Sequence, residues 1–369
     1  MSNKIRIGII GCGIGDFHAE AYLLDPRSEV ITMAGLDTDR CLEICKKNHI
    51  PEHTTNYEDV LARADIDAVS IAVPNYLHKP IAIAALRAGK HVLLEKPIAL
   101  DSVEGAEIVA EAERCGRVLG IAYSKRYRAD VQLLRKQVRA GALGEIYYAK
   151  AFWMRRAGIP GLGTWFTSKT LAGGGSLIDL GVHVIDMVLY LMGNPEVTTV
   201  SGATYAKLGP QGRGNWAGGR FRQQTESVFE VDDLATAMLR TADGATIHLE
   251  TSWAAYGSMT DEFGVALMGD KGGGEIHVHD YQKTPALRLF NDVDGVPTDL
   301  YPRMVVQHEH FSIVEQFLNS IIEGVPMSPS GHEGVDRARI IDLIYQSSQL
   351  GREINVAEAL ADVTTAVAD

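Results

Sequence analysis

The chain opens with the run Lys4-Ile5-Arg6-Ile7-Gly8-Ile9-Ile10-Gly11-Cys12-Gly13-Ile14-Gly15-Asp16-Phe17-His18. An apolar strand pattern leads into a glycine turn, and a helical pattern follows. This order of strand, glycine turn and helix predicts a Rossmann unit, in which a pyrophosphate lies at the positive N-terminus of the helix. Gly11 would permit the tight turn, and Gly13 would let the backbone come close to the phosphates.

Two features qualify this turn. Gly15 comes one residue earlier than the third glycine of G-x-G-x-x-G, so Asp16 stands where a small residue is expected. The turn alone would also suit an ordinary strand-to-helix connection.

A second strand pattern ends at Asp37, whose carboxylate could hydrogen-bond both ribose hydroxyls of an adenosine and repel a 2′-phosphate. We therefore expect NAD as the cofactor. Arg40 could instead accept a 2′-phosphate, so use of NADP stays open. The alternative for Asp37 is that it only caps the N-terminus of a helix.

Strand and helix patterns continue to alternate after Asp37. Helices of this length between strands predict a parallel, doubly wound sheet, and we place this Rossmann domain at residues 1–123. The further segments are a strand at 66–73, a helix at 78–88, a strand at 91–94, a helix at 101–115 and a strand at 118–122.

Two short segments lie just past predicted strand ends. They are Pro74-Asn75 and Glu95-Lys96-Pro97. Ligands bind at this edge of an open α/β sheet, so both segments should face the nicotinamide half of the cofactor. A lysine at the end of a buried strand is better suited to chemistry than to solubility, although Lys96 could simply pair with Glu95.

The pattern changes after residue 123. A helix at 130–140 is followed by segments that alternate with period two, which predicts strands. We expect an α+β domain at residues 124–369, with a large, mostly antiparallel sheet that has one open face and one face covered by helices. The strand segments are 146–153, 234–240, 245–253, 263–268 and 275–278.

One apolar helix in the second region carries two polar residues. It follows the glycine run 173–175, and Asp179 and His183 are four residues apart on it, so they share one face. Such residues are costly to bury unless paired, whereas at a cleft they could orient each other and exchange a proton with a substrate hydroxyl. A structural pair that caps the glycine loop is the alternative.

Five segments together are specific: Gly11 to His18, Ala72 to Asn75 with His78, Ala88 to Pro97, Gly173 to Asp186, and Glu333-Gly334 with Ile344 to Ser348. With them the chain resembles the glucose-fructose oxidoreductase, inositol dehydrogenase and rhizopine-catabolism (Gfo/Idh/MocA) family of NAD(P)-dependent oxidoreductases. The resemblance implies that Lys96 positions nicotinamide and takes part in catalysis. It implies further that Asp179 orients the substrate and that His183 is the acid or base.

Elementary chemistry agrees with these roles. Oxidation of a secondary alcohol by hydride transfer requires a group that accepts the hydroxyl proton. A histidine, with an ordinary pKa of about 6.5, suits this task, and a lysine ammonium could stabilise the developing alkoxide. We expect cofactor contacts from Gly11, Cys12, Gly13, Ile14, Gly15, Asp37, Arg40, Pro74, Asn75, His78, Glu95, Lys96, Arg126 and Trp165.

The substrate is expected to be a small polyhydroxylated molecule: a sugar, a glycoside or a cyclitol. Aromatic side chains such as Trp165 could stack on a sugar or close over the cofactor. The basic pair Arg155-Arg156 could indicate that the substrate is an acidic sugar or carries a phosphate, or the pair could belong to a solvated loop. The expected substrate contacts are Lys96, Trp153, Arg155, Asp179 and His183. Two other functions stay open: redox-neutral cleavage of a glycosidic bond with retained NAD, and non-catalytic sensing of NAD or sugar.

Composition and net charge limit the kinds of molecule that we expect this protein to bind. The 369 residues are 46% hydrophobic and carry a net charge of −12 without a basic cluster, which argues against nucleic acid and anionic membranes. No stretch approaches about 20 apolar residues, and no signal-peptide pattern precedes the first strand, so we expect a cytoplasmic protein. An open sheet face predicts a homodimer or homotetramer.

No metal is expected. The four cysteines show no C-x-x-C spacing, and Cys41 and Cys45 are better explained as helix-packing residues. The pairs His277-x-His279 and His308-x-His310 have no acidic or thiol partner nearby in the sequence.

Overall fold

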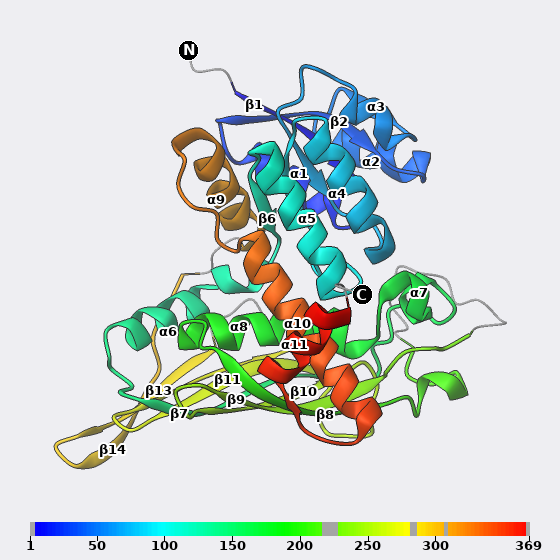
Figure 1. The fold of residues 1–369 in the computed structure, drawn as a ribbon. Helices are drawn as coiled ribbons and strands as arrows, with labels where there is room; N and C mark the ends of the chain where they lie inside the picture. The colour runs from blue at the N-terminus through cyan, green and yellow to red at the C-terminus, as the bar shows by residue number, and fades with distance from the viewer. Residues whose placement is uncertain (1–3, 216–227, 281–285, 306–308, 367–369) are drawn as a thin grey trace. The chain divides into compact units, whose positions relative to one another are not determined.

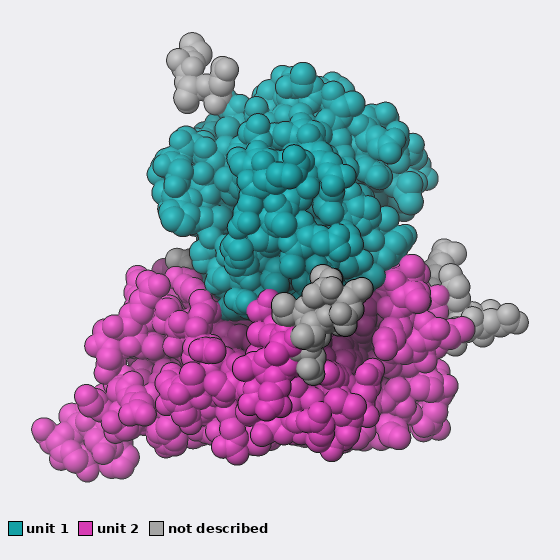
Figure 2. Space-filling model, viewed as in Figure 1, with its two compact units in different colours: residues 1–127, 308–338 teal, residues 128–307, 339–369 magenta. Residues whose placement is uncertain are grey.

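The computed structural model describes residues 4–215, 228–280, 286–305 and 309–366 (Figure 1). The chain forms two compact units (Figure 2): unit 1 is residues 1–127 with 308–338, and unit 2 is residues 128–307 with 339–369. The boundary expected at residue 123 thus lies four residues later, and residues 308–338 return to the first unit.

Unit 1 contains the predicted parallel sheet. Its strand order is β3-β2-β1-β4-β5-β6, and every pairing is parallel. The order reverses between β1 and β4, which is where ligands bind in sheets of this kind. The Rossmann fold is therefore confirmed. The strands are β1 (Ile5–Ile10), β2 (Ser28–Ala34), β3 (Glu52–Thr54), β4 (Ala68–Ile71), β5 (His91–Leu94) and β6 (Leu119–Ile121).

The helices of unit 1 have clear local signals. For example, the Asp101 side chain caps α5 by accepting from the Glu104 N–H, and Gly116 ends that helix with a left-handed backbone (φ 61°). Helices α4 and α5 pack side by side (Figure 1). The helices are α1 (Gly15–Leu23), α2 (Thr38–Lys47), α3 (Tyr57–Leu61), α4 (His78–Arg87), α5 (Ser102–Cys115) and α9 (Glu309–Glu323), with the 3-10 turns η1 (Asn75–Leu77) and η2 (Ser124–Tyr127).

Helix α9 joins unit 1 from a distant part of the sequence. Its residues Ile313, Val314, Phe317 and Leu318 are fully buried in the same core as β1 and α1. The i, i+1, i+4, i+5 spacing marks an apolar helix face, but it does not say which sheet the face will meet. This is why the sequence did not place residues 308–338 with the nucleotide-binding unit.

Unit 2 is built on a nine-stranded sheet of order β14-β13-β12-β11-β7-β10-β9-β8-β15. Only the β10–β7 pairing is parallel among the strands that the structure describes, so the predicted antiparallel sheet is confirmed. The strands are β7 (Ile146–Arg155), β8 (Val197–Tyr205), β9 (Leu234–Thr241), β10 (Thr246–Ser252), β11 (Asp261–Gly269), β12 (Gly273–His279), β13 (Leu287–Val293), β14 (Val296–Leu300) and β15 (Ile354–Asn355).

Helices cover one face of this sheet (Figure 1). Along β9, Ala235, Ala237 and Leu239 are buried under them, while the residues between point to the open face. The helical segments are α6 (Ala129–Arg139), η3 (Trp165–Thr167), α7 (Lys169–Ala172), a π-helical turn η4 (Leu177–Gly181), α8 (Val182–Met192), η5 (Gly209–Gln211), the part of α10 (Gly331–Leu350) from residue 339 onward, and α11 (Val356–Ala366).

The run Lys169–Met192, of 24 residues, contains a window with a mean hydropathy of 1.5, enough in length and composition to cross a membrane. Sequence inspection did not single it out, since glycine, aspartate and histidine interrupt it. In the structure 83% of its apolar window is buried. We therefore interpret its helical segments, of which α8 is the longest, as part of the buried core of unit 2.

Candidate active site

The glycine turn of unit 1 has the geometry of a phosphate cradle. Gly11 has φ 108°, and a Cβ there would collide with the carbonyl of Ala72. The space around Gly13 is open, which leaves its backbone accessible. A Cβ on Gly15 would lie 2.9 Å from the Ile9 side chain. Gly15 thus permits close packing of α1 on β1, the task of the third glycine, and the residues fit a dinucleotide despite the shortened spacing.

Asp16 has a separate role that its position in the motif did not reveal. Its buried carboxylate lies 3.1 Å from Arg40 Nη2 and 3.0 Å from Lys47 Nζ, and it accepts from the Asn48 amide at 3.0 Å. Arg40 also pairs with Glu43 at 2.6 Å. Asp16 therefore links α1 to α2. The Arg40 guanidinium, which could have accepted the 2′-phosphate of NADP, is held by the carboxylates of Asp16 and Glu43.

Asp37 follows β2 and caps α2. Its Oδ1 accepts from the Arg40 N–H at 3.0 Å, and the residue is exposed. The N-cap alternative is therefore confirmed. Contact of the same carboxylate with ribose stays a prediction, because a carboxylate can accept several hydrogen bonds at once.

His78 holds together the two loops that were expected to face nicotinamide. It is fully buried, with Nδ1 2.7 Å from the Pro97 carbonyl and Nε2 2.9 Å from the Val73 carbonyl. Burial lowers the pKa of His78 although both carbonyls favour its protonated form. These contacts give His78 a positioning role, and its predicted contact with the cofactor stays a prediction.

A buried network fixes the loop that carries Lys96. His18 Nδ1 lies 2.7 Å from Ser70 Oγ, and His18 Nε2 lies 2.9 Å from Glu95 Oε1. The other oxygen of Glu95 accepts from the Lys96 backbone N–H at 3.2 Å. Burial alone would raise the pKa of Glu95, but His18, Lys96 and His310 lower it overall. Ser70 was missed from the sequence because no motif marks it, and His310 was considered there only as a metal ligand.

The other predicted residues of unit 1 are also anchored. Arg126 is buried, and its Nη1 pairs with Glu333 at 2.7 Å. Asn75 is buried, whereas Pro74 and Lys96 are half-buried at the ends of their strands. Their contacts with NAD, and those of Cys12 and Ile14, stay predictions.

In unit 2, Asp179 and His183 differ from the helix around them. Both are half-buried, while every other residue from Leu177 to Leu189 is buried. The sequence predicted a regular α-helix, but Leu177–Gly181 forms a π-helical turn before α8. Such turns are frequent at functional sites because they change the direction in which side chains point.

Two tryptophans flank this pair. Trp253 Nε1 donates to Asp179 Oδ2 at 2.9 Å, and the Trp153 ring lies 5.5 Å from the His183 ring. Trp253 is fully buried and follows β10. It was predicted only as the end of a strand, and its separation from Asp179 by 74 residues left no local signal for the contact.

A buried carboxylate holds the start of the Asp179 helix. Four donors converge on Asp232: the Gly175 N–H at 2.9 Å, Ser176 Oγ at 2.7 Å, the Leu177 N–H at 2.9 Å and the Tyr345 hydroxyl at 2.6 Å. Burial and the charge of Asp232 raise the pKa of Tyr345 well above its usual value. The negative charge also suits a helix N-terminus.

Asp233, the next residue, holds Trp253, which is the hydrogen-bond partner of Asp179. The Asp233 carbonyl accepts from the Trp253 N–H at 2.8 Å, and the Asp233 carboxylate accepts from three backbone N–H groups at 207–209. Asp232-Asp233 therefore positions both partners of the Trp253–Asp179 hydrogen bond. The sequence analysis did not identify either aspartate.

Asp261 anchors two predicted substrate contacts. Trp153 Nε1 donates to Oδ1 at 2.8 Å, and Arg155 Nε donates to Oδ2 at 3.0 Å. Trp153 and Arg155 are both buried. Their contact with a substrate stays a prediction, but the structure shows that one carboxylate sets the orientation of both.

A series of aromatic rings extends from Trp165 to Trp253, which donates to Asp179. The rings of Trp165 and Phe166 stack at 3.8 Å, and the edge of Phe166 meets Trp253 at 6.5 Å. Arg156, the exposed neighbour of Arg155, lines a separate hollow of about 380 Å³ within unit 2, together with Arg213 and Tyr256.

A nucleotide cradle in unit 1 and a half-buried Asp–His pair in unit 2 define a dinucleotide-binding oxidoreductase. Residues 5–123 match the oxidoreductase family with an NAD-binding Rossmann fold, and residues 131–275 match the GFO/IDH/MocA C-terminal domain. D-glucoside 3-dehydrogenase of Escherichia coli (strain K12) is 30% identical and is aligned over 96% of this chain and 98% of its own length. The chain belongs to the GFO/IDH/MocA family, which confirms the predicted family, fold and NAD cofactor.

Levoglucosan dehydrogenase provides a second relative, in sequence and in structure. The enzyme of Pseudarthrobacter phenanthrenivorans is 28% identical over 97% of this chain and 100% of its own length. A solved structure of levoglucosan dehydrogenase with NADH and L-sorbose has a TM-score of 0.81 at 25% identity, and the match covers 96% of this chain and 99% of that one.

Proposed function

We propose that this protein is an NAD-dependent dehydrogenase that oxidises a secondary alcohol of a sugar, glycoside or cyclitol. The observation that carries the proposal is the half-buried Asp179–His183 pair on an otherwise buried helix, oriented by Trp253. The names of the relatives, D-glucoside 3-dehydrogenase and levoglucosan dehydrogenase, support a pyranoside as substrate.

The roles follow from the chemistry of each side chain. NAD, when bound, is the hydride acceptor. His183 takes the hydroxyl proton through its imidazole, Asp179 orients the hydroxyl, and the Lys96 ammonium stabilises the negative charge that develops on oxygen. The His18–Glu95 network fixes the loop of Lys96, and the Asp232 carboxylate fixes the helix of Asp179.

We propose a preference for NAD over NADP because the exposed carboxylate of Asp37 would repel a 2′-phosphate. Arg40 cannot readily compensate, since Asp16 and Glu43 hold its guanidinium. Asp37→Ser is expected to narrow the difference between the KM values for the two cofactors.

The partners and the compartment are part of the same proposal. We expect a cytoplasmic homodimer or homotetramer without nucleic acid or membrane partners. Tyr148, Phe152 and Met154 alternate with buried residues along β7 and are half-buried on the open sheet face, where a second copy would cover them. Replacing Phe152 by Glu should dissociate the oligomer, as measured by sedimentation velocity.

The first experiment compares wild type, Lys96→Ala and Lys79→Ala with NAD and a panel of aldoses, methyl glycosides, levoglucosan, cyclitols and sugar acids. Lys79 pairs with Glu107 at 2.8 Å on the surface and controls for the loss of any lysine. The proposal expects NADH from wild type and Lys79→Ala but not from Lys96→Ala. If NAD binds and glycosides are cleaved without net formation of NADH, redox-neutral cleavage replaces the dehydrogenase function. If the protein neither forms NADH nor cleaves glycosides, non-catalytic sensing replaces it.

A further inference from the structure

A cluster of possible metal ligands lies on the open face of the unit 2 sheet. Glu262 on β11 is paired directly opposite His279 on β12, and His277 is two residues earlier on the same strand. Side chains two residues apart share one face of a strand. The intervening Val278 and the neighbouring Phe263 are buried under the helices, so the three ligands point the other way.

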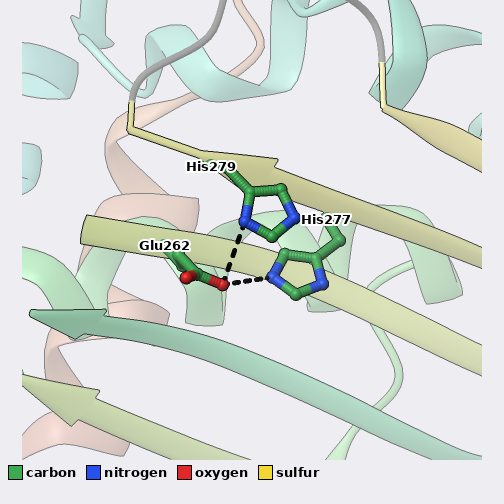
Figure 3. A group of neighbouring side chains, drawn as sticks. All are labelled: Glu262, His277 and His279. Carbon is green, nitrogen blue, oxygen red and sulfur yellow. Dashed lines mark hydrogen bonds and ion pairs between the residues drawn. The ribbon is translucent and has the colours of Figure 1, made fainter. Parts of the chain in front are cut away.

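The three side chains converge on one point (Figure 3). Glu262 Oε2 lies 2.8 Å from His277 Nε2 and 3.2 Å from His279 Nδ1. The three ligand atoms all lie within 4.8 Å of one another. With metal–ligand bonds of about 2.0 to 2.1 Å, donors of a tetrahedral site lie about 3.3 Å apart. The two imidazole rings are stacked at 4.2 Å with an angle of 20° between their planes, so one ring must turn about its side-chain bonds for both nitrogens to point at a common ion.

A second carboxylate, Glu275, lies near His277 but beyond hydrogen-bond distance. His277 Nδ1 lies 3.9 Å from Glu275 Oε1, and Arg288 Nη2 donates to Glu275 Oε2 at 2.6 Å. The Phe152 ring packs edge-on against the imidazole at 5.1 Å. In metal sites a carboxylate usually accepts a hydrogen bond from the far nitrogen of a ligating histidine, which fixes the tautomer and raises the basicity of the ligand. Glu275 would have to move closer to Nδ1 to make this hydrogen bond.

We propose that Glu262, His277 and His279 bind a divalent transition-metal ion of the Zn²⁺ class, with water at the fourth position. Two imidazoles and one carboxylate suit Zn²⁺ better than Mg²⁺ or Ca²⁺, which prefer oxygen ligands. The ion would link β11 to β12 through Glu262 and the two histidines. Sequence inspection rejected His277-x-His279 for want of an acidic partner, and strand pairing supplies Glu262 from 15 residues away.

The site is separate from the proposed chemistry. Asp179 and His183 belong to a helix that packs on the covered face of the sheet, whereas these ligands lie on the open face. Metal binding should therefore raise thermal stability without being required for hydride transfer.

The test uses the untagged full-length protein, dialysed against Zn²⁺ and then against metal-free buffer, with zinc measured per chain. We expect about one Zn²⁺ per chain in wild type, a raised Tm, and an intense visible spectrum with Co²⁺ that indicates tetrahedral coordination. The stoichiometric zinc should be lost in His277→Ala and in Glu262→Gln, which preserves side-chain volume. Glu275→Gln should weaken binding by about 10- to 100-fold.

His248→Ala is the matched control, since His248 is an exposed histidine on β10 of the same face. It should retain the zinc. The proposal is overturned if wild type retains no zinc, which would leave only a hydrogen-bonded Glu–His cluster, or if Glu262→Gln and His277→Ala retain as much as wild type. Circular dichroism of each variant shows that it is folded.

Discussion

The candidate nucleotide site of unit 1 and the Asp179–His183 pair of unit 2 are made in different ways. In unit 1 the predicted nucleotide contacts come mainly from backbone: the Gly11–Gly15 turn, the start of α1 and the loops after β4 and β5. In unit 2 the proposed chemistry comes from the side chains of Asp179 and His183, which distant residues hold in place. A backbone site depends on local glycines and strand order, whereas a side-chain site depends on buried partners far away in the sequence.

The largest expected effect is on His183. His183→Ala removes the proposed proton acceptor, so kcat/KM for the alcohol should fall by about 10²- to 10⁴-fold. Affinity for NADH should stay within twofold, because the nucleotide cradle belongs to unit 1. Steady-state kinetics and NADH fluorescence titration measure the two quantities. Equal losses in both quantities would contradict the assignment of proton transfer to unit 2 and nucleotide binding to unit 1.

Asp232 should show the next largest effect. Asp232→Ala leaves the Gly175 and Leu177 N–H groups, Ser176 Oγ and the Tyr345 hydroxyl without their buried acceptor. Unpaired buried groups cost about 1 to 3 kcal/mol each, partly relieved by water, so unit 2 should lose roughly 3 to 5 kcal/mol. Urea unfolding followed by tryptophan fluorescence measures the loss.

The matched control for this loss is Asp243→Ala. Asp243 is an exposed acid that accepts from the Thr241 hydroxyl in a turn. Its removal should change the free energy of unfolding by less than about 1 kcal/mol. Similar losses for the two variants would mean that Asp232 is not a special anchor.

Trp253 tests whether Asp179 must be oriented by its partner. Trp253→Phe removes the Nε1 donor but retains an aromatic ring. One hydrogen bond to a carboxylate is worth about 1.5 to 3 kcal/mol, so kcat/KM should fall by about 10- to 100-fold. A fall in kcat with unchanged KM would indicate a role in the transition state, and an unchanged kcat/KM would contradict the assignment.

The same contrast explains how much the sequence could predict. Gly11, Asp37 and the segments after β4 and β5 follow from local pattern and strand order, and the parallel sheet, the antiparallel sheet and the family were all predicted correctly. Asp179 and His183 were found because they interrupt an apolar helix. Trp253, Asp232 and Asp261 were not found, since their partners are 74, 55 to 113, and 106 to 108 residues away.

The docking of α9 on the first unit was missed for the same reason. So was the meeting of Glu262 with His277 and His279, which depends on the register of β11 against β12. Periodicity identifies the face that a residue occupies, but not the element that packs against it.

The smallest expected effect concerns pH and unit 1 alone. Burial, with His18 nearby, lowers the pKa of His310 to about 4 from an ordinary 6.5. The unfolded chain therefore binds this proton more readily than the folded one between these values, and stability present above pH 6.5 is lost as the pH falls toward 4. Because His310 stacks on Phe17 at 5.5 Å, His310→Phe keeps the ring contact and removes the titration.

Between pH 7 and pH 4 these two pKa values correspond to at most about 3 kcal/mol. Because His310 is only half-buried, we expect wild type to lose about 1 to 2 kcal/mol more stability than His310→Phe. Urea unfolding at a series of pH values measures the difference, and His332→Phe, at an exposed histidine on α10, is the control. Parallel curves for wild type and His310→Phe would refute the assignment. A difference confined to unit 1, with unchanged activity at pH 7, would show that even unit 1 depends on one side chain that is distant in sequence, because His310 reaches its core from α9.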